Sequence, residues 1–188
     1  QIILNAVEQY KTIYFPSGRY RVTETIKLKP NTVLVGLSPI TTQLLLLDNA
    51  SGFHGLGTPK PLLETPGGGA NIVTGMGLDT GGINSRAVAA KWMAGENSMM
   101  NDVKFLGGHG TYDTNGNYLK IYNNNRSADG DRNREWDRQY WSLWITDGGG
   151  GTFKNIWTAS PFAQAALYVS NTSTEGRIYA MSLEHHVR

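Results

Sequence analysis

The residues best suited to proton transfer stand at the end of the chain, as Glu184-His185-His186. A carboxylate beside imidazoles can act as a general acid or base near neutral pH. The preceding residue, Leu183, ends an alternating run, so an inward Leu183 would direct Glu184 and His186 outward. We expect Glu184 to be a catalytic acid and His185 and His186 to contact the substrate. An exposed polar ladder at a strand end would give the same pattern.

Aromatic and polar residues gather in a second place, at Trp136, Asp137, Tyr140 and Trp141. Sugar rings stack on aromatic planes, and carboxylate side chains bind their hydroxyls. Because the run that begins at Trp141 alternates, one of its faces is expected to be buried. We expect these four residues to bind a sugar substrate, with Trp136 and Tyr140 exposed. The alternative is that one or two of the aromatic residues anchor a loop on the core.

Composition excludes several other classes of site and partner. The sequence of 188 residues has a net charge of +2 and no cysteine. So small an excess of positive charge argues against a nucleic-acid partner, and no apolar run approaches the roughly 20 residues that span a bilayer. The stretch that starts at Asp129 resembles a calcium loop, but Arg134 stands where the turn glycine belongs and Tyr140 where the bidentate glutamate belongs. We expect no metal and no cofactor.

The elements that must position these residues show an internal repeat. Met76, Val103, Ile156 and Met181 occupy one position of four similar runs, at spacings of 27, 53 and 25 residues. A second short strand precedes each run. Strand pairs that recur about every 25 residues predict a parallel β-solenoid, because each coil buries its inward face only against its neighbours. The preceding strands align at Leu63, Trp92, Ile145 and Val169.

Domain organisation follows from the same repeat. We expect residues 1–188 to form a single β-helix domain that is a fragment of a larger protein, because neither end shows a start or stop signal. Residues 107–141 interrupt the repeat and are polar, with few apolar anchors. Solenoid insertions commonly emerge on one face and form a binding wall. We therefore expect 107–141 to be an insertion loop.

The opening of the chain carries a family resemblance. Residues 13–20 read Ile-Tyr-Phe-Pro-Ser-Gly-Arg-Tyr and residues 32–36 read Thr-Val-Leu-Val-Gly. These stretches resemble the first hairpin and strand of the pectate-lyase-like superfamily, over residues 1–47. Residues 87–110 and 148–188 look like bacterial polysaccharide-degrading members, of which the nearest named family is glycoside hydrolase family 55, the β-1,3-glucanases.

This resemblance implies a fold, an activity and a partner. The fold is an all-β, right-handed parallel β-helix with a short N-terminal capping helix. The activity is extracellular, inverting hydrolysis of a polysaccharide with a glutamate as the general acid. Family 55 enzymes consist of two tandem β-helices, so a second β-helix domain would be missing from this chain.

Glycoside hydrolysis needs a second carboxyl group, or another group that holds water, across the scissile bond. Asp147, which follows the strand that ends at Ile145, is the preferred candidate, ahead of Asp79 and Asp102. Asp102 stands at a turn into a strand, where such residues commonly bond backbone groups.

Three hypotheses stay open at this stage. The first is a secreted glycoside hydrolase of the β-1,3-glucanase type, with polysaccharide as its substrate. The second is a non-catalytic β-helix that binds glycan, as in a tailspike or adhesin. The third is a polysaccharide lyase acting on uronic-acid polymers, which would need calcium or clustered cations. Its candidates, Lys104, Lys154 and Arg177, are scattered over the repeats.

Overall fold

The computed structural model describes residues 2–47, 50–81, 84–107, 139–160 and 163–184. These residues form one helix, α1 (Ile2–Gln9), which is not long enough to cross a membrane, and a series of strands. The strands are β1 (Thr12–Phe15), β2 (Gly18–Val22), β3 (Ile26–Lys27), β4 (Val33–Gly36), β5 (Thr42–Leu46), β6 (Lys60–Glu64), β7 (Ile72–Asp79), β8 (Ala87–Trp92), β9 (Met99–Leu106), β10 (Gln139–Ile145), β11 (Gly151–Thr158), β12 (Ala163–Val169) and β13 (Gly176–Leu183).

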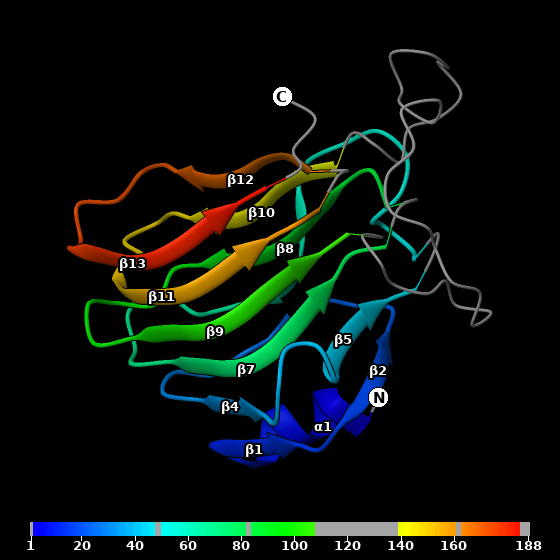
Figure 1. Ribbon diagram of the computed structural model, residues 1–188, viewed down its shortest axis with the longest axis horizontal. Helices are drawn as coiled ribbons and strands as arrows, with labels where there is room; N and C mark the ends of the chain where they lie inside the picture. Colours follow the sequence, from blue (N-terminus) through cyan, green and yellow to red (C-terminus); the bar gives the residue numbers. More distant parts are fainter. Residues whose placement is uncertain (1, 48–49, 82–83, 108–138, 161–162, 185–188) are drawn as a thin grey trace.

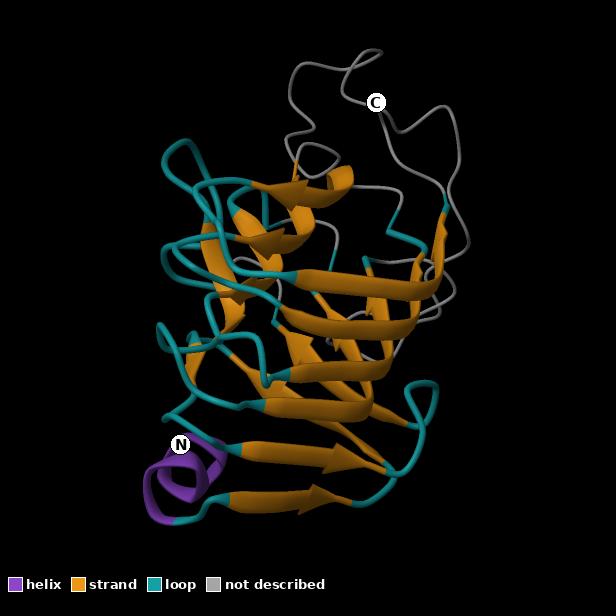
Figure 2. Ribbon diagram, turned by 90° about the vertical axis from the view of Figure 1, so that its left-hand side faces the viewer, coloured by secondary structure: helices purple, strands orange, loops and turns teal. Residues whose placement is uncertain are grey.

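The strands form two sheets that face each other, and the chain passes from one to the other in every coil (Figures 1 and 2). Sheet A has the order β1-β4-β7-β9-β11-β13, with β2 and β5 beside it, and sheet B has the order β12-β10-β8-β6-β3. Every pairing between strands is parallel. The fold is therefore the expected parallel β-helix with a short N-terminal helix.

The register of sheet A confirms the predicted repeat. Met76 lies opposite Val103, Val103 opposite Ile156, and Ile156 opposite Met181. Because the side chains at this position point inward, the first three are fully buried and Met181 packs against the same core. The recurring apolar residue in the sequence is therefore one inward column of the solenoid.

The register of sheet B corrects one of the predicted alignments. Trp92, Ile145 and Val169 lie opposite one another as expected. Leu63, however, lies opposite Ala90 and not Trp92, so the predicted alignment is wrong by two residues in this coil. The reason is packing, because the core accepts the small Ala90 in the column of Leu63. An alignment based on bulky apolar residues does not detect an alanine at this position.

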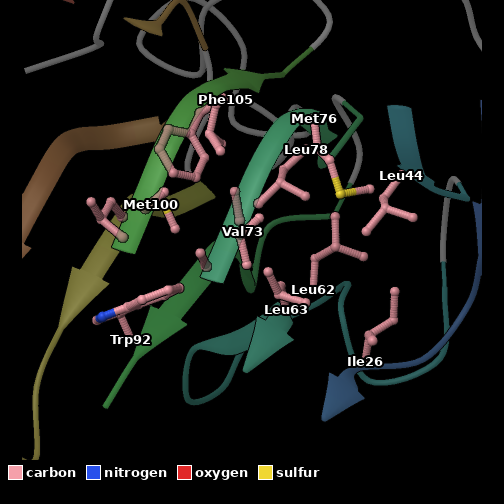
Figure 3. Packing of buried hydrophobic residues seen from close by; sticks show 14 of the residues in the cluster. Ile26, Leu44, Leu62, Leu63, Val73, Met76, Leu78, Trp92, Met100 and Phe105 are labelled. Atoms are coloured by element: carbon pink, nitrogen blue, oxygen red, sulfur yellow. The ribbon is translucent and has the colours of Figure 1, made fainter. Parts of the chain in front are cut away.

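The core fills the space between the two sheets (Figure 3). Trp92 is fully buried there, its Nε1 donates a hydrogen bond to the carbonyl of Gly150 at 3.0 Å, and its ring meets the edge of Phe153. At the N-terminal end α1 covers the first coil with Val7, which is buried. At the other end, among the described residues, the inward Ile178 and Leu183 are about half exposed.

Each strand of sheet A from β7 onward bends near its middle at a residue with a positive φ angle. These residues are Gly75 (69°), Asp102 (49°), Asn155 (54°) and Ala180 (52°), and each directly precedes the inward column of Met76. The left-handed conformation suits glycine, and asparagine and aspartate tolerate it better than other side chains. As a result two neighbouring residues of β9 and of β11 stay away from the core, as Asn101 and Asp102 do in β9.

The predicted insertion overlaps a strand. Gln139–Trp141, the end of the 107–141 segment, form the start of β10. The buried Gln139 ties this strand to the neighbouring coil, because its Oε1 accepts a hydrogen bond from Thr80 Oγ1 at 2.7 Å. Residues 108–138 lie outside the described part of the chain.

Candidate functional site

Glu184 continues the ladder of sheet A by one residue beyond β13. Its backbone N–H donates to the carbonyl of Thr158 at 2.9 Å, and its Oε1 accepts a hydrogen bond from Ser182 Oγ at 2.8 Å. Leu183 lies opposite Thr158, in the inward column. Glu184 and Ser182 therefore share the outer face of sheet A, as the alternation predicts, and Glu184 is exposed.

An aromatic ring lies next to this carboxylate. Ser182 is opposite Trp157, and Trp157 is opposite Lys104, so the three side chains form one outward column. The Lys104 ammonium lies 4.7 Å from the centre of the Trp157 ring. Neighbouring strands are about 4.8 Å apart. The Trp157 ring is thus one strand away from Ser182 and diagonal to Glu184.

Amide side chains occupy the same outer face, nearer the start of the strands. Asn155 Nδ2 donates to Asn101 Oδ1 at 3.0 Å, and Asn101 Nδ2 donates to Thr74 Oγ1 at 3.1 Å. The exposed Lys154 directly precedes Asn155 and lies opposite Asn101 on one side and Tyr179 on the other. Amides, ammonium groups and an indole ring together offer hydrogen bonds and a stacking plane to a polyhydroxyl ligand.

Asp147 lies in the turn between β10 and β11, with φ of 50°. Its Oδ1 accepts a hydrogen bond from Asn171 Nδ2 at 2.7 Å, and its Oδ2 lies 3.2 Å from Lys91 Nζ. The Asn171 bond, and then Lys91, lower the pKa of Asp147 below its ordinary value of 3.8. A carboxyl group that stays ionised cannot donate a proton, so Asp147 suits hydroxyl binding better than general-acid catalysis.

Four rings meet on the outer side of sheet B, and we call them the aromatic cluster: Tyr140, Trp141, Trp144 and Tyr168. Trp141 stacks on Tyr168 with ring centres 4.0 Å apart and meets the edge of Trp144 at 4.9 Å. Tyr140 meets Trp141 at 5.5 Å, and its hydroxyl donates to the carbonyl of Gly57 at 2.7 Å. The expectation that Tyr140 is exposed is therefore wrong, because its ring is half-buried and its hydroxyl is anchored, whereas Tyr168 is 40% exposed.

Sequence reasoning singled out Tyr140 and Trp141 but missed Trp144, Tyr168 and Lys91. The repeat could have revealed them, because Lys91 lies opposite Trp144 and Trp144 lies opposite Tyr168. All three therefore occupy one outward column of sheet B. The Lys91 ammonium lies 4.9 Å from the centre of the Trp144 ring.

The structure does not bring the proposed acid and its preferred partner together. Asp147 precedes β11 and Glu184 follows β13, and these strands of eight residues run parallel and in register. At about 3.3 Å per residue, the strand alone separates their positions by roughly 26 Å. Glycosidase carboxyl pairs are at most about 9.5 Å apart. Asp147 and Glu184 therefore cannot act on one glycosidic bond.

The other candidate carboxyl groups are no better placed. Asp79 is fully buried and accepts a hydrogen bond from the backbone N–H of Gly81 at 2.8 Å. It lies opposite Leu106, three strands from Glu184 in the stack, or roughly 14 Å. Asp102 occupies the bend in β9, about four residues before the level of Glu184. Neither reaches Glu184.

Four of the predicted site residues, Trp136, Asp137, His185 and His186, lie outside the described residues. Within the described ranges, no group of three or more His, Cys, Asp or Glu side chains could hold a metal ion.

Comparison with known proteins identifies the family. No curated protein matches the sequence. Among solved structures, the catalytic domain of a family 87 α-1,3-glucanase variant in complex with tetrasaccharides is 14% identical, with a TM-score of 0.25. That alignment covers 95% of this chain and 42% of the glucanase chain, so the chain spans less than half of that length. A family model described as rhamnogalacturonase A/epimerase, pectate lyase-like, matches residues 1–181, and the chain therefore belongs to this pectate-lyase-like family.

Proposed function

We propose that this carbohydrate-active β-helix protein is a secreted glycoside hydrolase that cleaves a polysaccharide of the β-1,3-glucan type, with Glu184 as the general acid. The observation that carries the proposal is the position of Glu184, exposed on the outer face of sheet A and diagonal to the Trp157 ring. Membership of a pectate-lyase-like family supports action on a carbohydrate.

The geometry of this face suggests how the substrate lies. A sugar ring stacked on Trp157 would place a neighbouring glycosidic oxygen over Ser182 and Glu184, because these side chains occupy the adjacent strand. Protonation of that oxygen by Glu184 would assist departure of the leaving group. The Ser182 hydroxyl, which donates to Glu184 Oε1, would fix the orientation of the carboxyl group.

A water must then attack from the opposite side of the sugar ring. Asp147 is too far away to activate it. We propose that Asp137, Trp136, His185 and His186 contact the substrate, as their residue types suggest.

Two observations favour other chemistry. The first is that none of the three weighed aspartates lies within reach of Glu184, which favours a β-helix that binds glycan without cleaving it. The second is that Lys104, Lys154 and Arg177 all belong to outward positions of sheet A, which favours a lyase acting on uronic-acid polymers. Arg177, however, pairs with Glu175 at 2.6 Å.

The decisive experiment is a screen of the protein, with its flanking sequence, against polysaccharides that include β-1,3-glucan, rhamnogalacturonan and polygalacturonate. Reducing ends released from β-1,3-glucan by the wild type but not by Glu184→Gln would support the proposal. Glu96→Gln, which changes an exposed carboxylate in the turn between β8 and β9, is the matched control and should retain turnover. Products that absorb as unsaturated uronates would show a lyase instead. Binding without any product would show a glycan-binding module.

A further inference from the structure

We propose that the outer side of sheet B carries a second glycan-binding surface, which is separate from Glu184 and selective for uncharged sugars. We call it the sheet B surface and define it as the aromatic cluster together with Lys91, Asp147 and Asn171. The inference shares with the proposed function only the assumption that the ligand is a polysaccharide.

The aromatic cluster provides the stacking plane. Trp141 and Tyr168 lie nearly parallel, at 23°, and Trp144 meets Trp141 edge-on. Trp141 and Trp144 are half-buried and Tyr168 is 40% exposed. A core needs no exposed rings, whereas the C–H faces of a pyranose pack well on such a surface. The Trp144 indole is also fixed in orientation, because its Nε1 donates to Ser170 Oγ at 3.0 Å.

Polar side chains lie beside the aromatic cluster, where the hydroxyl groups of a sugar stacked on the rings would reach these side chains. Asp147 and Asn171 follow Trp144 and Tyr168 by three residues each, in equivalent turns, and both have positive φ angles. The exposed carboxylate accepts hydrogen bonds and the exposed amide both donates and accepts them. A ring plane with a carboxylate and an amide at one edge is suited to a sugar that presents its hydroxyls sideways.

The charges of this surface favour an uncharged ligand. Along the outward column of sheet B, Lys27 lies opposite Glu64, and Glu64 lies opposite Lys91. The Lys91 ammonium is paired with Asp147. Within the sheet B surface, the cation Lys91 and the anion Asp147 therefore balance, and a uronate would find no excess of positive charge. Sheet A differs, because Lys104 and Lys154 stand on its outer face.

The two surfaces lie on different parts of the coil. The sheet B surface covers β8, β10 and β12 and the turns after them, while Glu184 follows the far end of sheet A (Figure 1). A polysaccharide chain can therefore be held on the sheet B surface without occupying the position beside Glu184.

The test measures binding and turnover separately. A soluble, uncharged β-1,3-glucan is the probe, polygalacturonate is the charged comparison, and binding is measured by affinity electrophoresis and calorimetry. The variants are Trp141→Ala/Tyr168→Ala, Tyr168→Ala alone, and Tyr14→Ala, which removes an exposed ring of β1 at the opposite end of the stack. Thermal unfolding of each variant establishes that it is folded.

We expect the double variant to bind the glucan about tenfold more weakly and Tyr168→Ala about threefold more weakly. Tyr14→Ala should bind like the wild type, and affinity should not change with salt. Turnover of a short, soluble oligosaccharide should stay within about twofold in Tyr14→Ala, whereas Glu184→Gln should lose turnover and retain binding. Unchanged binding in the aromatic variants alone overturns the sheet B surface. Unchanged turnover in Glu184→Gln alone overturns the role of Glu184.

Two results contradict the inference directly. One is a folded Tyr168→Ala or double variant that binds the glucan as well as the wild type. The other is tighter, salt-sensitive binding of polygalacturonate that the aromatic variants weaken. If the double variant does not fold, Tyr168→Ala decides the question, since its ring lies on the exposed edge of the last described strand of sheet B.

Discussion

The two sheets of this β-helix enclose one core but present different outer faces. In sheet A, strands β7 to β13 are eight residues long and bend at a residue with positive φ, so that neighbouring polar side chains of β9 and β11 stay outside. In sheet B, β6 to β12 are shorter and contain no residue with a positive φ angle within the strands themselves. The inward columns fix the fold, while the outward columns are free to specify chemistry.

The largest effect should separate the two faces by catalysis. Glu184→Gln removes the carboxyl proton that would be donated to the leaving-group oxygen. The substitution should therefore lower turnover by about 10²- to 10⁴-fold. Asp147→Asn, on the sheet B side, should leave turnover within about twofold, because the site holds an ionised carboxylate far from Glu184. Initial rates on a short, soluble oligosaccharide of the best polysaccharide in the screen measure both. Equal losses in the two variants would place one reaction across both faces and contradict the comparison.

The next effect, on the free energy of unfolding, tests whether the two sheets share one core. Trp92 ends β8 in sheet B and contacts Phe153 of sheet A, so Trp92→Ala should lower the free energy of unfolding by about 3–5 kcal/mol. Val169→Ala, in the same column but 52% exposed, should cost less than about 1 kcal/mol. Urea unfolding gives both values.

If Trp92→Ala does not fold, Trp92→Phe serves instead. It keeps most of the apolar volume but leaves the Gly150 carbonyl without its indole donor, at a cost of about 1–3 kcal/mol. A Trp92 substitution as mild as Val169→Ala would show that the two sheets do not share a cooperative core.

Much of the fold could be predicted because the inward column is periodic. Met76, Val103, Ile156 and Met181 are apolar in every coil, and a parallel stack must place such residues in register. The register failed only at Leu63, where the column continues as Ala90, a residue too small to stand out in the pattern.

The site was harder to predict, because outward residues obey no such rule. Asp147 was the preferred partner of Glu184 because it directly follows a repeat strand. In the solenoid, however, Asp147 precedes one strand of sheet A and Glu184 follows the next, so a whole strand length separates them. Trp144 and Tyr168 share a column, yet one outward aromatic residue per coil looks the same as a core residue until the register is known.

A smaller effect tests the bend that distinguishes sheet A. Gly75, Asp102 and Asn155 tolerate a left-handed backbone. Ala180, at φ of 52°, is strained there because its Cβ lies too close to the following carbonyl oxygen. Ala180→Gly should therefore raise the free energy of unfolding by about 1 kcal/mol. Ala165→Gly in β12, where no positive φ is required, should lower it by about 0.5–1 kcal/mol. Equal signs in urea unfolding would contradict the assigned bend.

The smallest effect concerns the charge that sheet B keeps on Asp147. Its lowered pKa means that ionised Asp147 adds stability above pH 3.8, and that this stability is lost as the pH falls through the still lower folded value. The Asn171 hydrogen bond is the largest single cause, and Lys91 adds both a hydrogen bond and its charge, so Asn171→Ala and Lys91→Met should each raise the pKa of Asp147 toward 3.8. Carboxyl ¹³C titration by NMR measures both shifts. A larger rise in Lys91→Met would make the ion pair the main support of the charge, and the balance of the sheet B surface would then depend on salt.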